Sequence, residues 1–136
     1  MIVRSYRDLI AWQKSLDLVT EVYRCTQSFP REETYGLTAQ LRRAAVSVPS
    51  NIAEGHARLT SGEFRQFLGY ALGSVAEIET QIFVARCLGY VTTGESEALL
   101  ARATEIGKIL RGLQQSISSK GQQQPRVTII RRNPSP

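Results

Sequence analysis

Apolar residues recur at intervals of three and four along most of the chain, which is the spacing of amphipathic helices. Four such runs are separated by turn signals, and no alternating strand pattern competes with them before residue 120. The expected buried faces of the four helices are Leu9, Trp12, Leu16, Val19, Tyr23 and Thr26; Leu37, Leu41, Ala44, Val48 and Ile52; Phe64, Phe67, Ala71, Val75, Ile78, Ile82 and Ala85; and Leu99, Ala103, Ile106, Leu110, Leu113 and Ile117.

Residues with capping and helix-breaking properties mark the ends of these runs. Capping-box spacing occurs three times, at Ser5 with Asp8, Thr60 with Glu63 and Thr92 with Glu95. Phe29-Pro30 is expected to end the first helix, Gly55 and the charged segment around Arg58 the second, and Gly89 the third. Because short connections force neighbouring helices to run antiparallel, we expect an all-α fold, an up-down-up-down antiparallel four-helix bundle.

The net charge of +5 is concentrated in a short C-terminal segment. Residues 1–119 carry 13 Lys and Arg against 12 Asp and Glu, whereas residues 120–136 carry Lys120, Arg126, Arg131 and Arg132 without any acid. The chain is therefore expected to divide into a four-helix bundle over 1–119 and a basic, flexible tail over 120–136. Residues 118–126 have the composition of a linker, and an alternative interpretation makes residues 127–130 a strand added to a partner.

Length and composition restrict the class of protein. A chain of 136 residues with 42% apolar and 21% charged residues is typical of one soluble globular domain. No apolar stretch approaches the roughly 20 residues that span a membrane, and charges near Met1 interrupt any signal-peptide core. Two cysteines are too few for a disulfide scaffold. We therefore expect a cytoplasmic protein with no membrane partner.

No residue pattern indicates catalysis. His56 is the one histidine in the sequence and has no nearby cysteine with which to bind a metal. Cys25 and Cys87 lack the Cys-x-x-Cys spacing of redox sites, and the chain has no glycine-rich phosphate loop. We therefore expect no catalytic, metal or cofactor site, and a protein that is not an enzyme.

Polar residues form a stripe on the second and on the third helix, at steps of three and four. In an antiparallel hairpin, facing residues have position numbers of nearly constant sum, and four pairs sum to 120 or 121: Gln40 with Gln81, Arg43 with Glu77, Ser47 with Ser74, and Asn51 with Tyr70. We predict a polar seam that contains an Arg43–Glu77 ion pair and specifies the register of the hairpin. The competing interpretation places both stripes on a subunit interface or in a ligand groove.

Two further features of the middle helices need a reason. Pro49 lies inside the second helix beside short polar residues, either as a structural bend or as a recognition surface. Gly69, Gly73 and Ala76 form a line of small residues on the third helix. Since glycine weakens a helix, the line indicates close approach by another helix, within the chain or across an oligomer interface.

The block Ser47-Val-Pro-Ser-Asn-Ile-Ala-Glu-Gly55 carries a family resemblance. With Asp8-Leu-x-x-Trp-Gln-Lys14, Glu63-Phe-x-x-Phe-Leu68 and Gly73-Ser-x-x-Glu-Ile-Glu79, it resembles the bacterial family of four-helix-bundle proteins encoded in intervening sequences of large-subunit ribosomal RNA genes. The resemblance covers residues 5–117, and accessory proteins of diversity-generating retroelements look like a divergent branch. It implies a ring-like homopentamer without enzymatic activity that, in the retroelement branch, binds nucleic acid and a reverse transcriptase.

The expected function is therefore that of a non-enzymatic homo-oligomer, pentameric by resemblance, that binds RNA or DNA through phosphate contacts. Arginine suits such contacts because its planar guanidinium binds phosphate in a bidentate manner. The expected phosphate ligands are Arg42, Arg58, Arg65, Lys120, Arg126, Arg131 and Arg132. The alternative is a protein-interaction scaffold, such as the accessory subunit of a retroelement reverse transcriptase.

Overall fold

The computed structural model describes the backbone of residues 4–123 and side chains as far as Ile117. It contains α1 (Ile10–Thr26), α2 (Leu37–His56), α3 (Ser61–Cys87) and α4 (Thr93–Gln123). Two short 3₁₀ turns precede α1 and α2, η1 (Tyr6–Asp8) and η2 (Arg31–Glu33). Residues 124–136, which include Arg126, Arg131, Arg132 and the alternative strand at 127–130, lie outside the described residues.

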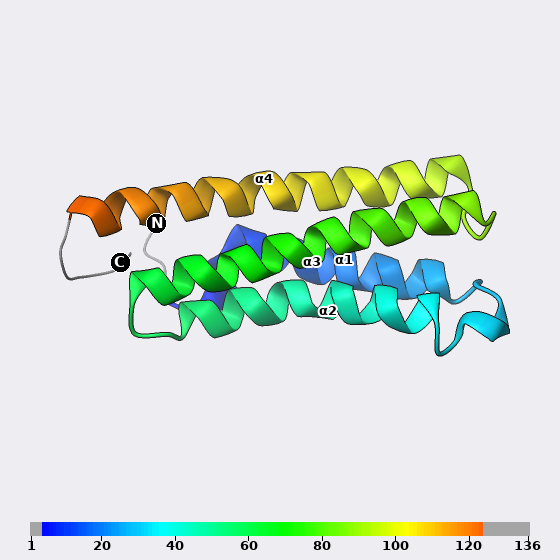
Figure 1. The fold of residues 1–136 in the computed structure, drawn as a ribbon, viewed down its shortest axis with the longest axis horizontal. Coiled ribbons are helices and arrows are strands. Elements are labelled where there is room, and N and C mark those ends of the chain that lie inside the picture. Colours follow the sequence, from blue (N-terminus) through cyan, green and yellow to red (C-terminus); the bar gives the residue numbers. More distant parts are fainter. Residues whose placement is uncertain (1–3, 124–136) are drawn as a thin grey trace.

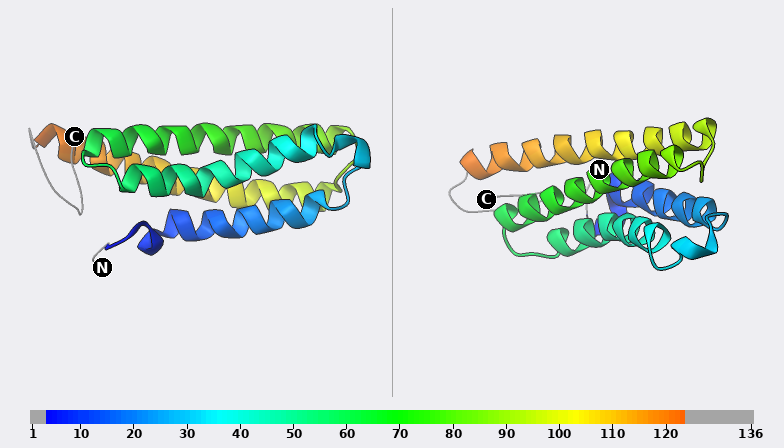
Figure 2. Two further views of the ribbon diagram at one scale, coloured as in Figure 1. Left: turned by 90° about the horizontal axis from the view of Figure 1, so that it is seen from below. Right: turned by 45° about the vertical axis from the view of Figure 1, so that its right-hand side comes forward.

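The four helices form the up-down-up-down antiparallel bundle that the hydrophobic pattern predicts (Figures 1 and 2). Helix α3 packs against α2 on one side and α4 on the other, and α1 closes the bundle by packing on α2 and α4. The α2–α3 turn and the last turns of α4 consequently lie at the same end of the bundle (Figure 1). The η2 turn, the start of α2 and the α3–α4 turn lie at the other end.

The predicted buried faces of α2, α3 and α4 form the core, with Leu37, Phe64, Phe67 and Leu113 at its half-buried edge. The predicted face of α1 is confirmed only in part: Thr26 is buried, and Leu9, Trp12 and Val19 pack half-buried against the core. Its buried residues are Ala11, Ser15, Leu18, Val22 and Thr26, whereas Leu16 and Tyr23 are 41% and 40% exposed. The buried face of α1 includes Ala11 and Ser15, and Ser15 satisfies its hydroxyl by donating to the Trp12 carbonyl at 2.7 Å. Several larger apolar residues of α1 therefore remain at the surface.

The ends of the helices follow the capping signals with three corrections. Thr92 and Glu95 form a reciprocal capping box at the start of α4, with bonds of 3.0 and 2.8 Å. Gly89 ends α3 in the left-handed region at φ 77°, as expected. The Ser5–Asp8 box forms but caps η1, because Leu9 is extended and α1 begins only at Ile10.

The second correction concerns α4, which continues to Gln123 through residues whose composition predicted a linker. No helix-breaking proline occurs between Ile117 and Pro125, so the serine and glutamine residues in between continue the helix. Lys120, expected at the start of the tail, accordingly lies in the last turns of α4.

Gly55 has a different role from the helix-ending one predicted for it. It lies inside α2, buried, with the helix continuing to His56. A Cβ atom at Gly55 would come within 2.5 Å of the Phe67 Cβ on α3. The missing side chain therefore lets α2 and α3 approach each other closely beside the turn that joins them.

Candidate nucleic-acid interface

Arg42, a predicted phosphate ligand, is used inside the fold. Its Nε donates to the Thr26 hydroxyl at 2.8 Å and its Nη2 to the Tyr23 carbonyl at 3.3 Å. The guanidinium also stacks over the Tyr23 ring, with Cζ 4.4 Å from the ring centroid. Arg42 thus ties α2 to the last turn of α1, where a cation also complements the negative end of the helix dipole.

Arg58, at the α2–α3 turn, is compensated by two carboxylates. Its Nη2 lies 2.9 Å from Glu54 Oε2 and its Nη1 lies 3.8 Å from Glu63 Oε2. Its guanidinium stacks on Phe67 at 4.7 Å. A phosphate group would have to compete with both acids, so Arg58 is a weaker candidate than its position in the sequence indicates.

Arg65, on the second turn of α3, is exposed, and its guanidinium has no hydrogen-bond or ion-pair partner among residues 4–117. Its backbone carbonyl accepts a bond of 3.2 Å from Gln114 Nε2 on α4. Arg58 and Arg65 lie at the end where α4 finishes, whereas Arg42 lies near the opposite end. The structure therefore separates the three bundle arginines that were expected to act together.

Charge is divided along the bundle axis into a basic end and an acidic end. The basic end, residues 4–20, 47–73 and 108–123, holds eight cations against Asp8, Asp17, Glu54 and Glu63. Its cations are Arg4, Arg7, Lys14, Arg58, Arg65, Lys108, Arg111 and Lys120. The acidic end, residues 21–46 and 74–107, holds six cations against eight acids. Helix α4 ends at Gln123 at this end of the bundle, and the sequence that follows it adds Arg126, Arg131 and Arg132.

Lys108 and Arg111 are candidate ligands that the sequence-based prediction missed. Both side chains are exposed on α4. A signal existed in the sequence, since residues 106–123 contain no acid at all.

The predicted polar seam between α2 and α3 forms in part. Gln81 Nε2 donates to Gln40 Oε1 at 3.3 Å, and the Ser47 hydroxyl bonds to that of Ser74. These two pairs have the register that the antiparallel hairpin requires. Gln81 is buried, and its Oε1 has no hydrogen-bond partner among residues 4–117.

The predicted Arg43–Glu77 ion pair is wrong. Glu77 instead accepts a bond of 3.2 Å from Gln81 Nε2, one helical turn further along α3. Arg43 is exposed and has no ion-pair partner within residues 4–117. A donor on the same helix thus occupies the carboxylate, and the cation remains at the surface.

Asn51 and Tyr70 also do not bond to each other. Asn51 Nδ2 donates to the Ser47 carbonyl at 2.8 Å, and Tyr70 packs edge-on against Phe67 at 5.2 Å. The Ser47 and Ser50 hydroxyls likewise bond to carbonyls of α2, which passes unbroken through Pro49. The polar groups around Pro49 serve their own helix, which favours the structural interpretation of the proline.

His56 and Cys25 have reactive side chains but do not belong to a cluster of metal-ligating groups among the described residues. His56 is half-buried against Phe64, and burial lowers its pKa while Asp8 acts in the opposite direction. Burial, reinforced by Glu95 and Glu21, raises the pKa of the Cys25 thiol. Within the described part of the chain, no three metal-ligating side chains gather and no helix is long and apolar enough to cross a membrane.

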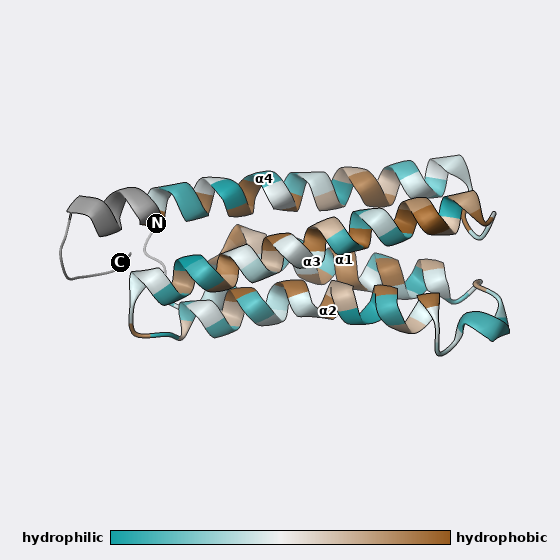
Figure 3. Cartoon of the chain, in the orientation of Figure 1, coloured by the Kyte–Doolittle hydropathy of each residue, from teal (hydrophilic) through white to brown (hydrophobic). Residues whose placement is uncertain are grey.

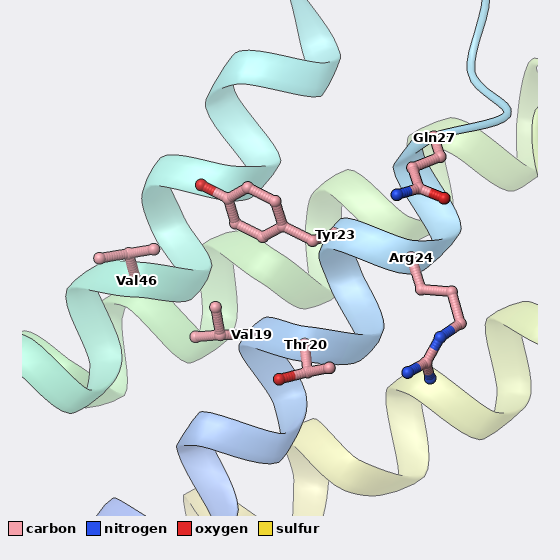
Figure 4. Close-up of a pocket in the computed structure, with 6 residues that line it drawn as sticks. All are labelled: Val19, Thr20, Tyr23, Arg24, Gln27 and Val46. Atoms are coloured by element: carbon pink, nitrogen blue, oxygen red, sulfur yellow. The ribbon is translucent and has the colours of Figure 1, made fainter.

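A shallow depression of about 510 Å³ lies between α1 and α2 (Figure 4). It is lined by Val19, Thr20, Tyr23, Arg24, Gln27 and Val46. Tyr23 and Val46 are about 40% exposed. The depression is therefore lined in part by apolar side chains that the core leaves exposed.

These features define an antiparallel four-helix-bundle protein with one basic end. The chain belongs to the 23S rRNA-intervening sequence protein family, whose model matches residues 7–112. It is also similar to a crystal structure described as a protein with unknown function from the S23 ribosomal protein family of Bacteroides thetaiotaomicron. That structure is 21% identical, has a TM-score of 0.72 and aligns over 78% of this chain and 96% of its own, which shows the shared fold. No curated protein matches the chain.

Proposed function

We propose that this protein is a non-enzymatic, cytoplasmic homo-oligomer, pentameric by family resemblance, that binds nucleic acid through phosphate contacts. The observation that carries the proposal is the division of charge along the bundle, with a surplus of cations at the end where α4 finishes. Such a surplus attracts polyanions and displaces their counterions, with little requirement for a particular base sequence.

The structure changes the set of residues that would make the contacts. Arg42 is committed to α1, and Arg58 is paired with two acids. Arg65, Lys108 and Arg111 are exposed and belong to the basic end, from which the tail continues. In an oligomer these groups repeat, so individually weak phosphate contacts add up to firm binding.

Self-association is supported by the apolar residues along α1 and α2. Leu16, Tyr23 and Val46 are each about 40% exposed, and the last two line the depression of Figure 4. Exposed apolar area of this kind commonly marks protein contacts. The same surface favours the second candidate function, a scaffold for another protein such as a reverse transcriptase. A mass of one chain by light scattering would contradict the homo-oligomer.

The proposal is tested by a salt titration of RNA and DNA binding with the full chain and with a chain ending at Gln123. We expect the logarithm of the affinity to fall linearly with the logarithm of the salt concentration. A shallower slope after truncation would assign contacts to Arg126, Arg131 and Arg132, and an equal slope would assign them to the bundle. Absence of binding by both chains at low salt, with circular dichroism showing intact helices, would refute nucleic-acid binding and leave the scaffold.

A further inference from the structure

The basic end has one surface without any acidic residue, between α3 and α4. Residues 64–76 of α3 and 106–123 of α4 contain no Asp or Glu. We call the seam between these two segments the α3–α4 strip. Among the residues as far as Ile117, its exposed cations are Arg65 from α3 and Lys108 and Arg111 from α4.

Two sets of contacts show where α3 and α4 meet along this strip. Gln114 Nε2 reaches over to the Arg65 carbonyl at 3.2 Å. Further along, Nη1 of Arg111 lies 3.6 Å from where a Cβ on Gly107 would stand, and Val75 Cγ1 of α3 lies 3.8 Å from that point. The Arg111 guanidinium therefore lies beside the boundary between the two helices.

The strip ends where acids return. The Glu79 carboxylate accepts a bond of 3.3 Å from the Thr104 hydroxyl across the same two helices. From Arg65 to Ala76 the helix rises about 17 Å, at 1.5 Å per residue. That length matches about five nucleotides of one strand at 3.4 Å each.

The small residues of α3 lie along this strip, and among the described residues only Gln114 of α4 comes within 4 Å of a Cβ placed on Gly69 or Gly73. Gly73 and Ala76 are exposed, and a Cβ at Gly73 would meet nothing within 4 Å. At Gly69 the nearest atom is Gln114 Nε2 at 3.4 Å. The intrachain helix contact that the small residues indicated is thus absent over Gly73 and Ala76, and the backbone of α3 is accessible between the cations.

We propose that the α3–α4 strip holds the phosphodiester backbone of an RNA or DNA strand. Arg65, Lys108 and Arg111 contact its phosphates, and Gly69 and Gly73 let the strand approach the helix without collision with side chains. The proposal rests on the proposed function, since it names the surface on which nucleic acid binds. It removes Arg42 and Arg58 from the binding set and replaces them with two cations of α4.

The first test removes cations from the strip and, as a control, from elsewhere. The double variant Lys108→Gln/Arg111→Gln is compared with Arg43→Gln/Arg102→Gln, which removes two exposed cations from the acidic end. Binding of a labelled 20-nucleotide poly(U) RNA is titrated with salt. We expect the strip variant to lower the slope by about 1.4, since each lost single-strand contact removes about 0.7, and the control to leave it unchanged.

The second test adds charge to the strip with little effect on the fold. Gly73→Glu and Gly73→Gln have side chains of similar size that extend into open space. We expect Gly73→Glu to bind the RNA at least several-fold more weakly than Gly73→Gln, with the same helical content and mass.

The outcomes separate this inference from the proposed function. If the wild-type chain shows no salt-dependent binding, both are wrong. If the wild-type chain binds and the two double variants show the same salt dependence, either both reduced or both unchanged, nucleic-acid binding stands. In that case only its assignment to the α3–α4 strip is wrong. A change of oligomeric mass in Gly73→Gln would show that a second copy covers the strip, which also overturns the assignment.

Discussion

The same substitution, glycine to alanine inside a helix, should have opposite effects on stability at Gly55 and Gly73. Both residues lie within helices, and neither has a positive φ. In the absence of other contacts, alanine is more favourable than glycine in a helix by about 1 kcal/mol. The two sites differ in what surrounds the added methyl group, so the comparison isolates tertiary packing from helix propensity.

The methyl group of Gly55→Ala collides with α3. Its carbon would lie 2.5 Å from the Phe67 Cβ and 3.2 Å from Phe64 Cδ1, against an ordinary contact of 3.4–4 Å. The Phe67 Cβ is attached directly to the backbone and cannot rotate away, so α2 and α3 must separate. Overpacking of this kind costs about 1–3 kcal/mol, more than the helix propensity returns at the penultimate residue of α2.

We therefore expect Gly55→Ala to lower the free energy of unfolding by about 1–2 kcal/mol and Gly73→Ala to raise it by up to about 1 kcal/mol. The corresponding changes in Tm are a fall of about 4–8 °C and a rise of about 4 °C. Thermal and urea unfolding followed by circular dichroism measure both, at one protomer concentration because self-association shifts Tm. A Gly55→Ala chain as stable as the wild type would refute the close approach of α2 and α3.

Three further predictions concern the acidic end and the cysteines. The Glu33 carboxylate accepts a hydrogen bond from the backbone N–H of Leu37 at the start of α2, and this bond lowers the pKa of Glu33 in the folded protein. The bond therefore stabilises the fold fully above the pKa that Glu33 has in the unfolded chain, and this stabilisation is lost as the pH falls through the lower pKa of the folded protein. The stability gap between wild type and Glu33→Gln should therefore close on acidification in urea titrations. Thr92→Ala should cost about 1 kcal/mol by removing the α4 cap, measured in the same way. Cys87, which is exposed, should react with a thiol reagent before Cys25, and equal rates would contradict the burial of Cys25.

The fold could be predicted because helical periodicity, caps and short connections all indicate one topology. The buried faces of α2, α3 and α4 follow from spacing alone, and so does the register of Gln40 with Gln81. The face of α1 could not be predicted this way. The buried positions there include the small residues Ala11 and Ser15 beside Leu18 and Val22. The larger Leu16 and Tyr23 remain exposed, so the spacing of large apolar residues alone gives a face that is rotated from the buried one. Large apolar residues are also exposed near the C-terminal end of α3, which is strongly hydrophobic in Figure 3. These exposed residues are Phe83, Val84 and Leu88.

The candidate site was harder to predict than the fold because a charge count ignores partners. Arg42 and Arg58 have the same charge as Arg65 in the sequence, yet one is bonded to α1 and the other to two carboxylates. Those bonds depend on which helices meet and where. The fold also determines where acidic residues are absent from the surface. Antiparallel packing brings the segment of α4 without acidic residues beside the corresponding segment of α3.

The block that carries the family resemblance explains the packing of α2 on α3. Its Ser47 bonds to Ser74, its Asn51 satisfies an α2 carbonyl near Pro49, and its Gly55 admits Phe67. The bonds of Ser47 and Asn51 and the packing at Gly55 all serve the α2–α3 hairpin. A resemblance based on this block therefore identifies the fold, while binding has to be inferred from surface residues outside it. Arg65, Lys108 and Arg111 are such residues, so two members of one family can share the hairpin and still differ in what they bind.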